Sequence, residues 1–190
     1  GSIITTTGFM TVDFDQWPSL SRYVLLFLMM IGACAGSTGG GMKVSRFLLS
    51  VKSALRELNS YLFPKSVKKI KMDGKTVDEE AIRGINVYFT AYILLVVLSV
   101  FLICINGMDI ESAFSSVLGT FNNIGPGLGK FGPTCNFGWV STFSKYVYIF
   151  DMLAGRLELF PVLILLYPPS WRGLLKRSMK RKKNKRATTI

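Results

Sequence analysis

Long apolar runs separated by charged segments dominate the pattern of this sequence. Residues 84–107 contain no charged residue over 24 positions, and a helix of this length crosses the roughly 30 Å hydrocarbon core of a bilayer. A second apolar stretch begins at Ser19, and a third extends over residues 138–168. The pattern therefore predicts an all-α integral membrane protein with several membrane spans.

Glycines interrupt the first apolar stretch. Residues 19–35 read as a helix, and the helical pattern resumes over residues 42–58 after the segment GSTGGG at residues 36–41. An uninterrupted helix does not fit, because each glycine costs roughly 1 kcal/mol relative to alanine. A phosphate-binding loop is excluded, since no Gly-Lys-Ser/Thr follows the glycines. We therefore predict a transmembrane helix that is broken at residues 36–41.

A short helix and a glycine-rich loop follow the uncharged run. Residues 109–121 predict a helix with Asp109 as its N-cap, and about 12 residues are too few to cross a bilayer. The next residues, NNIGPGLG from residue 122, cannot form regular helix. Irregular backbone at membrane depth must be buried in protein or face a water-filled cavity. We predict a re-entrant pore helix at residues 109–121 and a carbonyl-lined ion pathway at residues 122–127.

The segment between the broken helix and the uncharged run, residues 64–83, is polar. Its residues alternate around Asp73-Gly74, which is a two-residue hairpin signal, although a mobile loop is the alternative. Asp78, with Glu79 and Glu80 behind it, predicts the start of a helix.

Basic residues are concentrated in two blocks. The net charge is +12, with ten Lys or Arg over residues 43–83 and nine over residues 172–186. Basic blocks that alternate with membrane-length segments follow the positive-inside rule, so both blocks are expected in the cytosol. We expect no nucleic-acid partner, and we expect the basic tail at residues 170–190 to bind anionic lipid.

Composition also limits the chemistry. The chain has no histidine, and its three cysteines (Cys34, Cys104, Cys135) show no CxxC spacing. A zinc site or a disulfide framework is therefore not expected. The last apolar stretch carries Asp151 and Arg156, and a charge inside a membrane normally faces a polar cavity or a partner. The chain does not begin with Met, so we expect it to be part of a longer protein.

The two halves of the chain have similar spacing. Gly8 lies 28 residues before Gly36, and Gly125 lies 31 residues before Arg156. If both loop glycines lie at the same depth, Arg156 stands level with the break at residues 36–41. A duplicated unit would then place both loops at one pore mouth.

Four motifs in order, TTTGF, AGSTGGGMK, NNIGPGLG and GRLELF, resemble the later repeats of the Trk/Ktr/HKT superfamily of potassium transporters. The resemblance implies repeated span–re-entrant pore helix–span units around a pseudo-fourfold, potassium-channel-like pore. Residues 1–63 would be the end of the third unit, with its filter loop and broken second span. Residues 84–169 would be the fourth unit, joined to the third by a cytosolic loop at 64–83.

The resemblance also implies roles for individual residues. The implied filter residues are Thr6, Thr7, Gly8, Phe9, Asn123, Ile124, Gly125 and Pro126. Of these, the implied K⁺ ligands are Thr6, Thr7, Gly8, Asn123, Ile124 and Gly125. The implied gating residues are Gly36, Ser37, Thr38, Gly39, Gly40, Gly41 and Arg156.

The expected function is potassium uptake across the plasma membrane, the inner membrane of a bacterium, with K⁺ as the transported ion and no covalent cofactor. By resemblance, the partners are the remaining repeats, a second copy in a homodimer, a cytosolic nucleotide-binding regulatory subunit and membrane lipids. Two alternatives stay open. One is a membrane enzyme with Asp151 or Glu158 as general base, and the other is a non-conducting subunit whose basic tail binds partners or lipid.

Overall fold

The computed structural model describes residues 1–32, 34, 36–37, 39–63, 69–72, 74–157 and 159–166. Its elements in chain order are η1 (Phe14–Gln16), α1 (Ser19–Met30), β1 (Ile31–Gly32), β2 (Met42–Lys43), α2 (Val44–Leu62), β3 (Lys71–Met72), β4 (Lys75–Thr76), α3 (Glu79–Cys104), α4 (Ile110–Phe121), η2 (Gly129–Phe131), α5 (Thr142–Arg156) and α6 (Leu159–Leu166). Four sequence-predicted features lie outside the described residues: Thr38, Asp73, Glu158 and the basic tail at residues 170–190.

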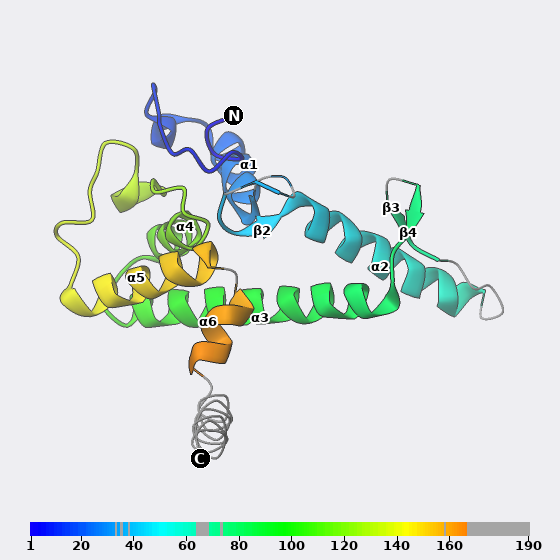
Figure 1. Ribbon diagram of the computed structural model, residues 1–190. Helices are drawn as coiled ribbons and strands as arrows, with labels where there is room; N and C mark the ends of the chain where they lie inside the picture. Colours follow the sequence, from blue (N-terminus) through cyan, green and yellow to red (C-terminus); the bar gives the residue numbers. More distant parts are fainter. Residues whose placement is uncertain are drawn as a thin grey trace, which may run out of the picture.

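Helix α3 is the long element on which the others are assembled (Figure 1). It begins at Glu79, next to its N-cap Asp78, where the sequence predicts a helix start, and it ends at Cys104, so it contains most of the uncharged run at residues 84–107. The acidic first turn and the apolar run form one helix, because carboxylates stabilise the positive end of the helix dipole. Among the described residues, α3 is the one helix both long and apolar enough to cross a membrane, while α1 is apolar but shorter.

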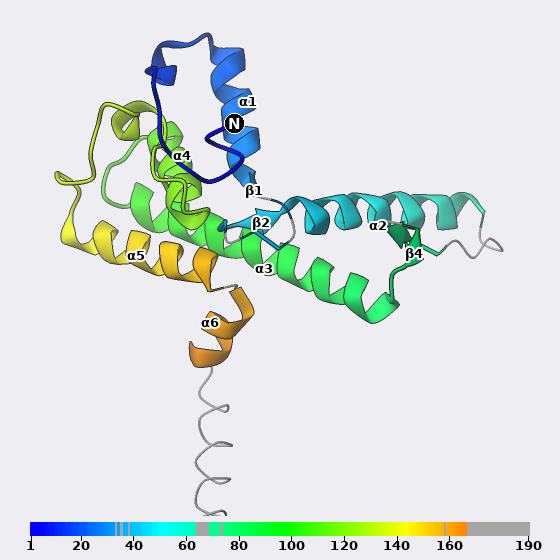
Figure 2. The ribbon, with the colours of Figure 1, turned by 45° about the horizontal axis from the view of Figure 1, so that its top comes forward.

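Helix α4 lies in the centre of the assembly and packs against α1, α3 and α5 (Figure 2). Asp109 is its N-cap and accepts a hydrogen bond from the backbone N–H of Ser112 over 3.0 Å. Residues 115–121 are all buried. A helix buried on every side is typical of the core of a larger assembly.

The first helix break is wider than the sequence pattern predicts. Helix α1 ends at Met30 instead of residue 35, and α2 begins at Val44. The two ends of the break run side by side as a parallel strand pair, with Ile31 opposite Met42. Gly32 allows this approach, because a Cβ there would lie 2.7 Å from the carbonyl oxygen of Gly40. The fold is therefore helical, as the sequence predicts, with the addition of two strand pairs of two residues each.

The last span is also broken, which corrects the single span predicted over residues 138–168. Helix α5 ends at Arg156, and α6 begins at Leu159. The physical reason is Pro161, whose ring would collide with the carbonyl of Leu157 in a continuous helix. In the first turn of α6 a proline is tolerated, because its missing N–H has no partner there in any case.

The polar segment contains the predicted hairpin. Strands β3 and β4 pair antiparallel, with Met72 opposite Lys75, and Gly74 has a φ of +76°. Ile70 beside the hairpin packs with Leu49 of α2 and Ile82 of α3 in a small apolar cluster. The hairpin is thereby held where α2 and α3 lie next to each other.

Candidate ion pathway

Two segments far apart in the sequence have the same unusual backbone. Thr6 and Asn123 both have a φ of +55°, and Gly8 and Gly125 have φ values of +77° and +107°. Residues other than glycine rarely adopt positive φ. Each pair is separated by 117 residues, so the two segments match position for position.

The same correspondence holds for the backbone hydrogen bonds. In the second segment, the N–H of residue 122 donates to the Leu118 carbonyl and the N–H of residue 123 to the Thr120 carbonyl. The N–H groups of residues 124 and 125 both donate to the Gly119 carbonyl. In the first segment, the N–H of residue 5 donates to the Gly1 carbonyl and the N–H of residue 6 to the Ile3 carbonyl. The N–H groups of residues 7 and 8 both donate to the Ser2 carbonyl, so each donor and acceptor are as far apart along the chain as in the second segment. The two segments are therefore structural copies, and residues 1–4 take the place of the last turn of α4.

The copies approach each other closely. A Cβ on Gly8 would overlap the carbonyl oxygen of Ile124, so this oxygen points at the first segment. At Gly125 the space is open, since a Cβ there would meet no atom within 4 Å. The structure thus brings the predicted residues 6–9 and 123–126 together.

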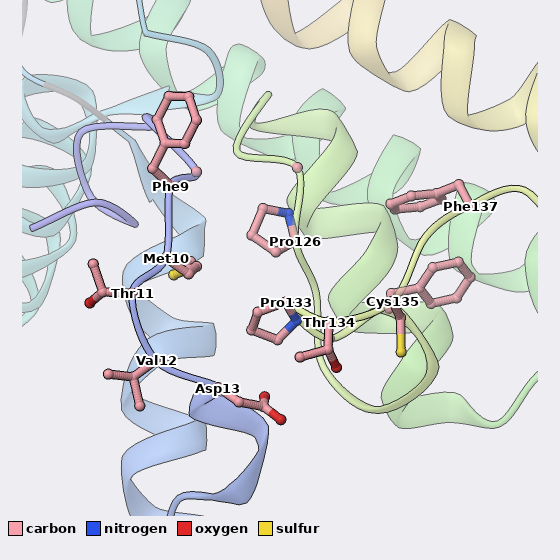
Figure 3. A pocket seen from close by; sticks show the side chains of 14 residues that line it. Phe9, Met10, Thr11, Val12, Asp13, Pro126, Pro133, Thr134, Cys135 and Phe137 are labelled. Atoms are coloured by element: carbon pink, nitrogen blue, oxygen red, sulfur yellow. The ribbon is translucent and has the colours of Figure 1, made fainter.

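A cavity of about 480 Å³ lies where the copies meet. Figure 3 shows Phe9 and Met10 of the first copy on one side and Pro126 and Pro133 on the other. Asp13 adds a carboxylate to the wall, and a negative charge in a concave site concentrates cations. The cavity is lined mostly by apolar side chains and glycine backbone, with Asp13 as the one charged residue among the described residues that line it.

The glycine loop lies at the opposite end of the second copy. The N–H of Gly41 donates to the carbonyl of Gly155 over 3.3 Å. A Cβ on Gly40 would lie 2.8 Å from the Asn122 carbonyl oxygen, so the loop touches the start of this copy. Gly40 and Gly41 are buried there, whereas Gly36 and Ser37 are exposed.

Arg156 is the last residue of α5 and directly follows Gly155. A Cβ on Gly155 would overlap the carbonyl oxygen of Phe121, which ends α4. The helix end that carries Arg156 is therefore packed against both the glycine loop and the end of α4. The spacing of residues along the two halves of the sequence likewise puts Arg156 level with the break at residues 36–41.

Sequence reasoning missed an ionic contact between the two units. Arg22 of α1 forms ion pairs with Asp15, at 3.4 Å, and with Glu111 of α4. Asp15 also accepts a hydrogen bond from the N–H of Gly129 over 2.9 Å. We call Asp15, Arg22 and Glu111 the outer clamp, because they join α1 and the chain before it to α4 and to the loop at Gly129.

Two smaller contacts hold the start of α4. Lys130 forms an ion pair with Asp109 at 3.5 Å. The hydrogen bonds that Asp109 accepts from Ser112 lower the pKa of its carboxyl below the ordinary value. The N-cap is therefore ionised at neutral pH, which favours the positive end of the α4 dipole.

The buried Asp151 does not behave as a catalytic base. Its carboxylate accepts a hydrogen bond from the Ser99 hydroxyl over 2.6 Å and is fully buried between α3 and α5. A general base must reach its substrate, and this carboxylate has no exposed surface. Across the described parts of the chain, no cluster of three His, Cys, Asp or Glu side chains is suited to a metal ion.

A model of the TrkH family, described as cation transport proteins, matches residues 2–171. The chain belongs to the TrkH family. The resemblance noted from the four motifs is thereby confirmed, and the family consists of membrane transport proteins, not of enzymes.

Individual relatives agree with this family. The Trk system potassium uptake protein TrkH of Vibrio parahaemolyticus is 46% identical over 172 residues. The protein of the same name from Escherichia coli K12 is 42% identical over 171 residues. The match covers 90% of this chain and 35% of each relative, so the chain spans about a third of their length.

A solved structure agrees as well. The crystal structure of the potassium transporter TrkH from Vibrio parahaemolyticus matches with a TM-score of 0.80 and 45% sequence identity. The match covers 89% of this chain and 36% of that chain. The TrkH fold therefore accounts for nearly the whole chain.

Proposed function

We propose that this chain is part of a potassium uptake transporter and supplies two filter segments, at residues 6–9 and 123–126. The observation that carries the proposal is the shared backbone of these segments, with positive φ at the same two positions. Named relatives of this family are potassium uptake proteins. The remaining repeats of the full-length protein complete the ring of segments.

The chemistry follows from the backbone. Carbonyl oxygens replace the water shell of K⁺ in such a pathway. Glycine at residues 8 and 125 permits positive φ and close approach of the main chain, since it has no Cβ. The ligands are therefore main-chain oxygens of Thr6, Thr7 and Gly8 in one copy and of Asn123, Ile124 and Gly125 in the other.

The gate lies at the other end of the segment. The glycine loop at residues 36–41 obstructs the path below the filter, and Arg156 acts beside it. Its guanidinium raises an electrostatic barrier to cations or binds the loop in the closed position. The packing of Gly41 on Gly155 supports this arrangement, because it holds the loop against the helix end that carries Arg156.

The remaining partners follow from the family. The transporter lies in the inner membrane of a bacterium as a homodimer and contacts a cytosolic nucleotide-binding subunit. The hairpin at residues 71–76 and the basic tail are candidate contacts for this subunit and for anionic lipid.

Complementation tests the function. The full-length protein is expressed in a bacterium that lacks its own potassium uptake systems, and growth is measured across a range of external K⁺. Growth at low K⁺ that an empty vector does not support is the expected result. Normal membrane expression without rescue contradicts the transporter and favours a non-conducting subunit.

A further inference from the structure

Asn122 lies between the pore helix and the second filter segment and has no role in the pathway described so far. Its side chain is fully buried. The side-chain amide donates to the Leu118 carbonyl over 3.0 Å, and it exchanges hydrogen bonds with the Tyr92 hydroxyl over 3.1 and 3.2 Å. A buried amide is costly unless its polar atoms have partners, so these contacts fix its orientation.

The first copy separates two roles of this side chain. Thr5 occupies the matching position, and its hydroxyl donates to the Gly1 carbonyl over 2.9 Å. Gly1 corresponds to Leu118, so both copies close the end of the pore helix in the same way. Thr5 is exposed, however, while Asn122 also binds Tyr92. The Tyr92 contact is therefore not required to build the turn.

The glycine loop rests on this same amide. A Cβ on Gly41 would overlap the side-chain oxygen of Asn122 and lie 2.6 Å from its Cγ. A Cβ on Gly40 would lie 2.8 Å from the amide nitrogen of Asn123. The loop thus meets the filter segment at two side-chain amides, with Asn122 under its last glycine.

Tyr92 connects the amide to the helix that follows the loop. Its ring is fully buried, packs edge-on against Phe121 at 5.0 Å and stacks with Tyr88 at 6.5 Å. The guanidinium of Arg46 in α2 lies 4.4 Å from the Tyr88 ring centroid, a cation–π contact. A continuous set of contacts therefore runs from α2 through α3 to Asn122.

We propose that Asn122 is a positioning residue that holds the glycine loop in its closed place, with Tyr92 orienting the amide. This inference rests on the proposed function and adds the contact through which the loop and the second filter segment act on each other. When the loop departs, the amide keeps its bonds to Leu118 and Tyr92, so opening leaves the helix end intact. Opening therefore breaks the packing of Gly41 on Asn122, together with the Gly41–Gly155 hydrogen bond and the contact of Gly40 with Asn123.

Cys34 offers a reporter for the position of the loop, because it lies in the break and is exposed. The full-length transporter is placed in liposomes with Cys34 as its single cysteine, and labelling by a membrane-impermeant maleimide is timed. Asn122→Thr keeps the bond that Thr5 makes in the first copy but loses the amide. Tyr92→Phe removes one hydroxyl.

Each variant is expected to raise the labelling rate about five-fold, the effect of one typical hydrogen bond, together with K⁺ flux. Since both changes break the same contact, the double variant should label no faster than the faster single variant. Thr5→Asn is the matched control and should leave labelling unchanged, because the described glycines of the loop, Gly40 and Gly41, pack on Asn122 and Asn123 and not on Thr5.

Unchanged labelling in both single variants overturns the proposal, and so do fully additive effects. A lower K⁺ to Na⁺ ratio with unchanged labelling also overturns it, because Asn122 then supports only the filter. Absence of K⁺ flux in the unmodified protein contradicts the proposed function instead, and the labelling rates still test the contact between Asn122 and the loop.

Discussion

The backbone N–H of Gly41 donates a hydrogen bond to the carbonyl oxygen of Gly155. This bond joins the two broken helices, because Gly41 lies in the first break, before α2 begins at Val44, and Gly155 is the next-to-last residue of α5, before the second break. Neither glycine has room for a side chain, since Asn122 crowds Gly41 and the Phe121 carbonyl crowds Gly155. These contacts therefore bring together the glycine loop, the end of α4 and the end of α5 that carries Arg156.

Substitution of Arg156 tests the gate. We expect Arg156→Ala to raise K⁺ flux in liposomes, because the variant removes the charge and the hydrogen-bond donors next to the loop. Arg156→Lys separates the two mechanisms: it keeps flux low if the barrier is electrostatic and raises flux if the guanidinium binds the loop. Unchanged or reduced flux in Arg156→Ala contradicts the assigned role.

Substitution of Gly125 tests the filter. We expect Gly125→Ser to weaken selectivity for K⁺ over Na⁺, measured as a permeability ratio. The cause is conformational, since the φ of +107° disfavours a side chain although the surrounding space is open. Gly84→Ala is the control, because Gly84 is helical with open space around it. An unaltered ratio in Gly125→Ser argues against the filter assignment.

Substitution of Gly155 tests the packing of α5 on the pore helix. A methyl group there would overlap the Phe121 carbonyl, and main chain cannot swing away as a flexible side chain can. We expect Gly155→Ala to cost about 3 kcal/mol of stability, the upper part of the usual range for overpacking, seen as a lower melting temperature in detergent. A melting temperature equal to that of the unmodified protein would show that α5 can move away from α4 without a loss of stability.

The outer clamp is expected to contribute to stability across the two units. Arg22→Gln should lower the free energy of unfolding by about 1 kcal/mol, since partly exposed ion pairs are weak. A double-mutant cycle with Glu111→Gln measures the coupling, which high salt should reduce. The Lys130–Asp109 pair is the comparison: its side chains are 56% and 50% exposed, against 24% for Arg22. The coupling energy of the Arg22–Glu111 pair should therefore exceed that of the Lys130–Asp109 pair, and the reverse order would contradict the prediction.

Local backbone chemistry made several features predictable. Asp109 caps α4, Gly74 turns the hairpin and Asp78 precedes α3, each because of its own conformational or charge preference. The residues at which helices end were harder to predict. Pro161 carried the signal for the second break, but the apolar run on both sides concealed it.

The sequence by itself determined the order of apolar runs, the two glycine-bearing loops at residues 6–9 and 123–126, and the family to which the chain belongs. Tertiary structure alone decided which polar groups meet. Tyr92 and Asn122 are 30 residues apart, Arg22 and Glu111 are 89, and Asp15 and Gly129 are 114. The physical reason is that backbone preferences act between neighbours along the chain, whereas a buried hydrogen bond forms only after packing has brought its two groups together.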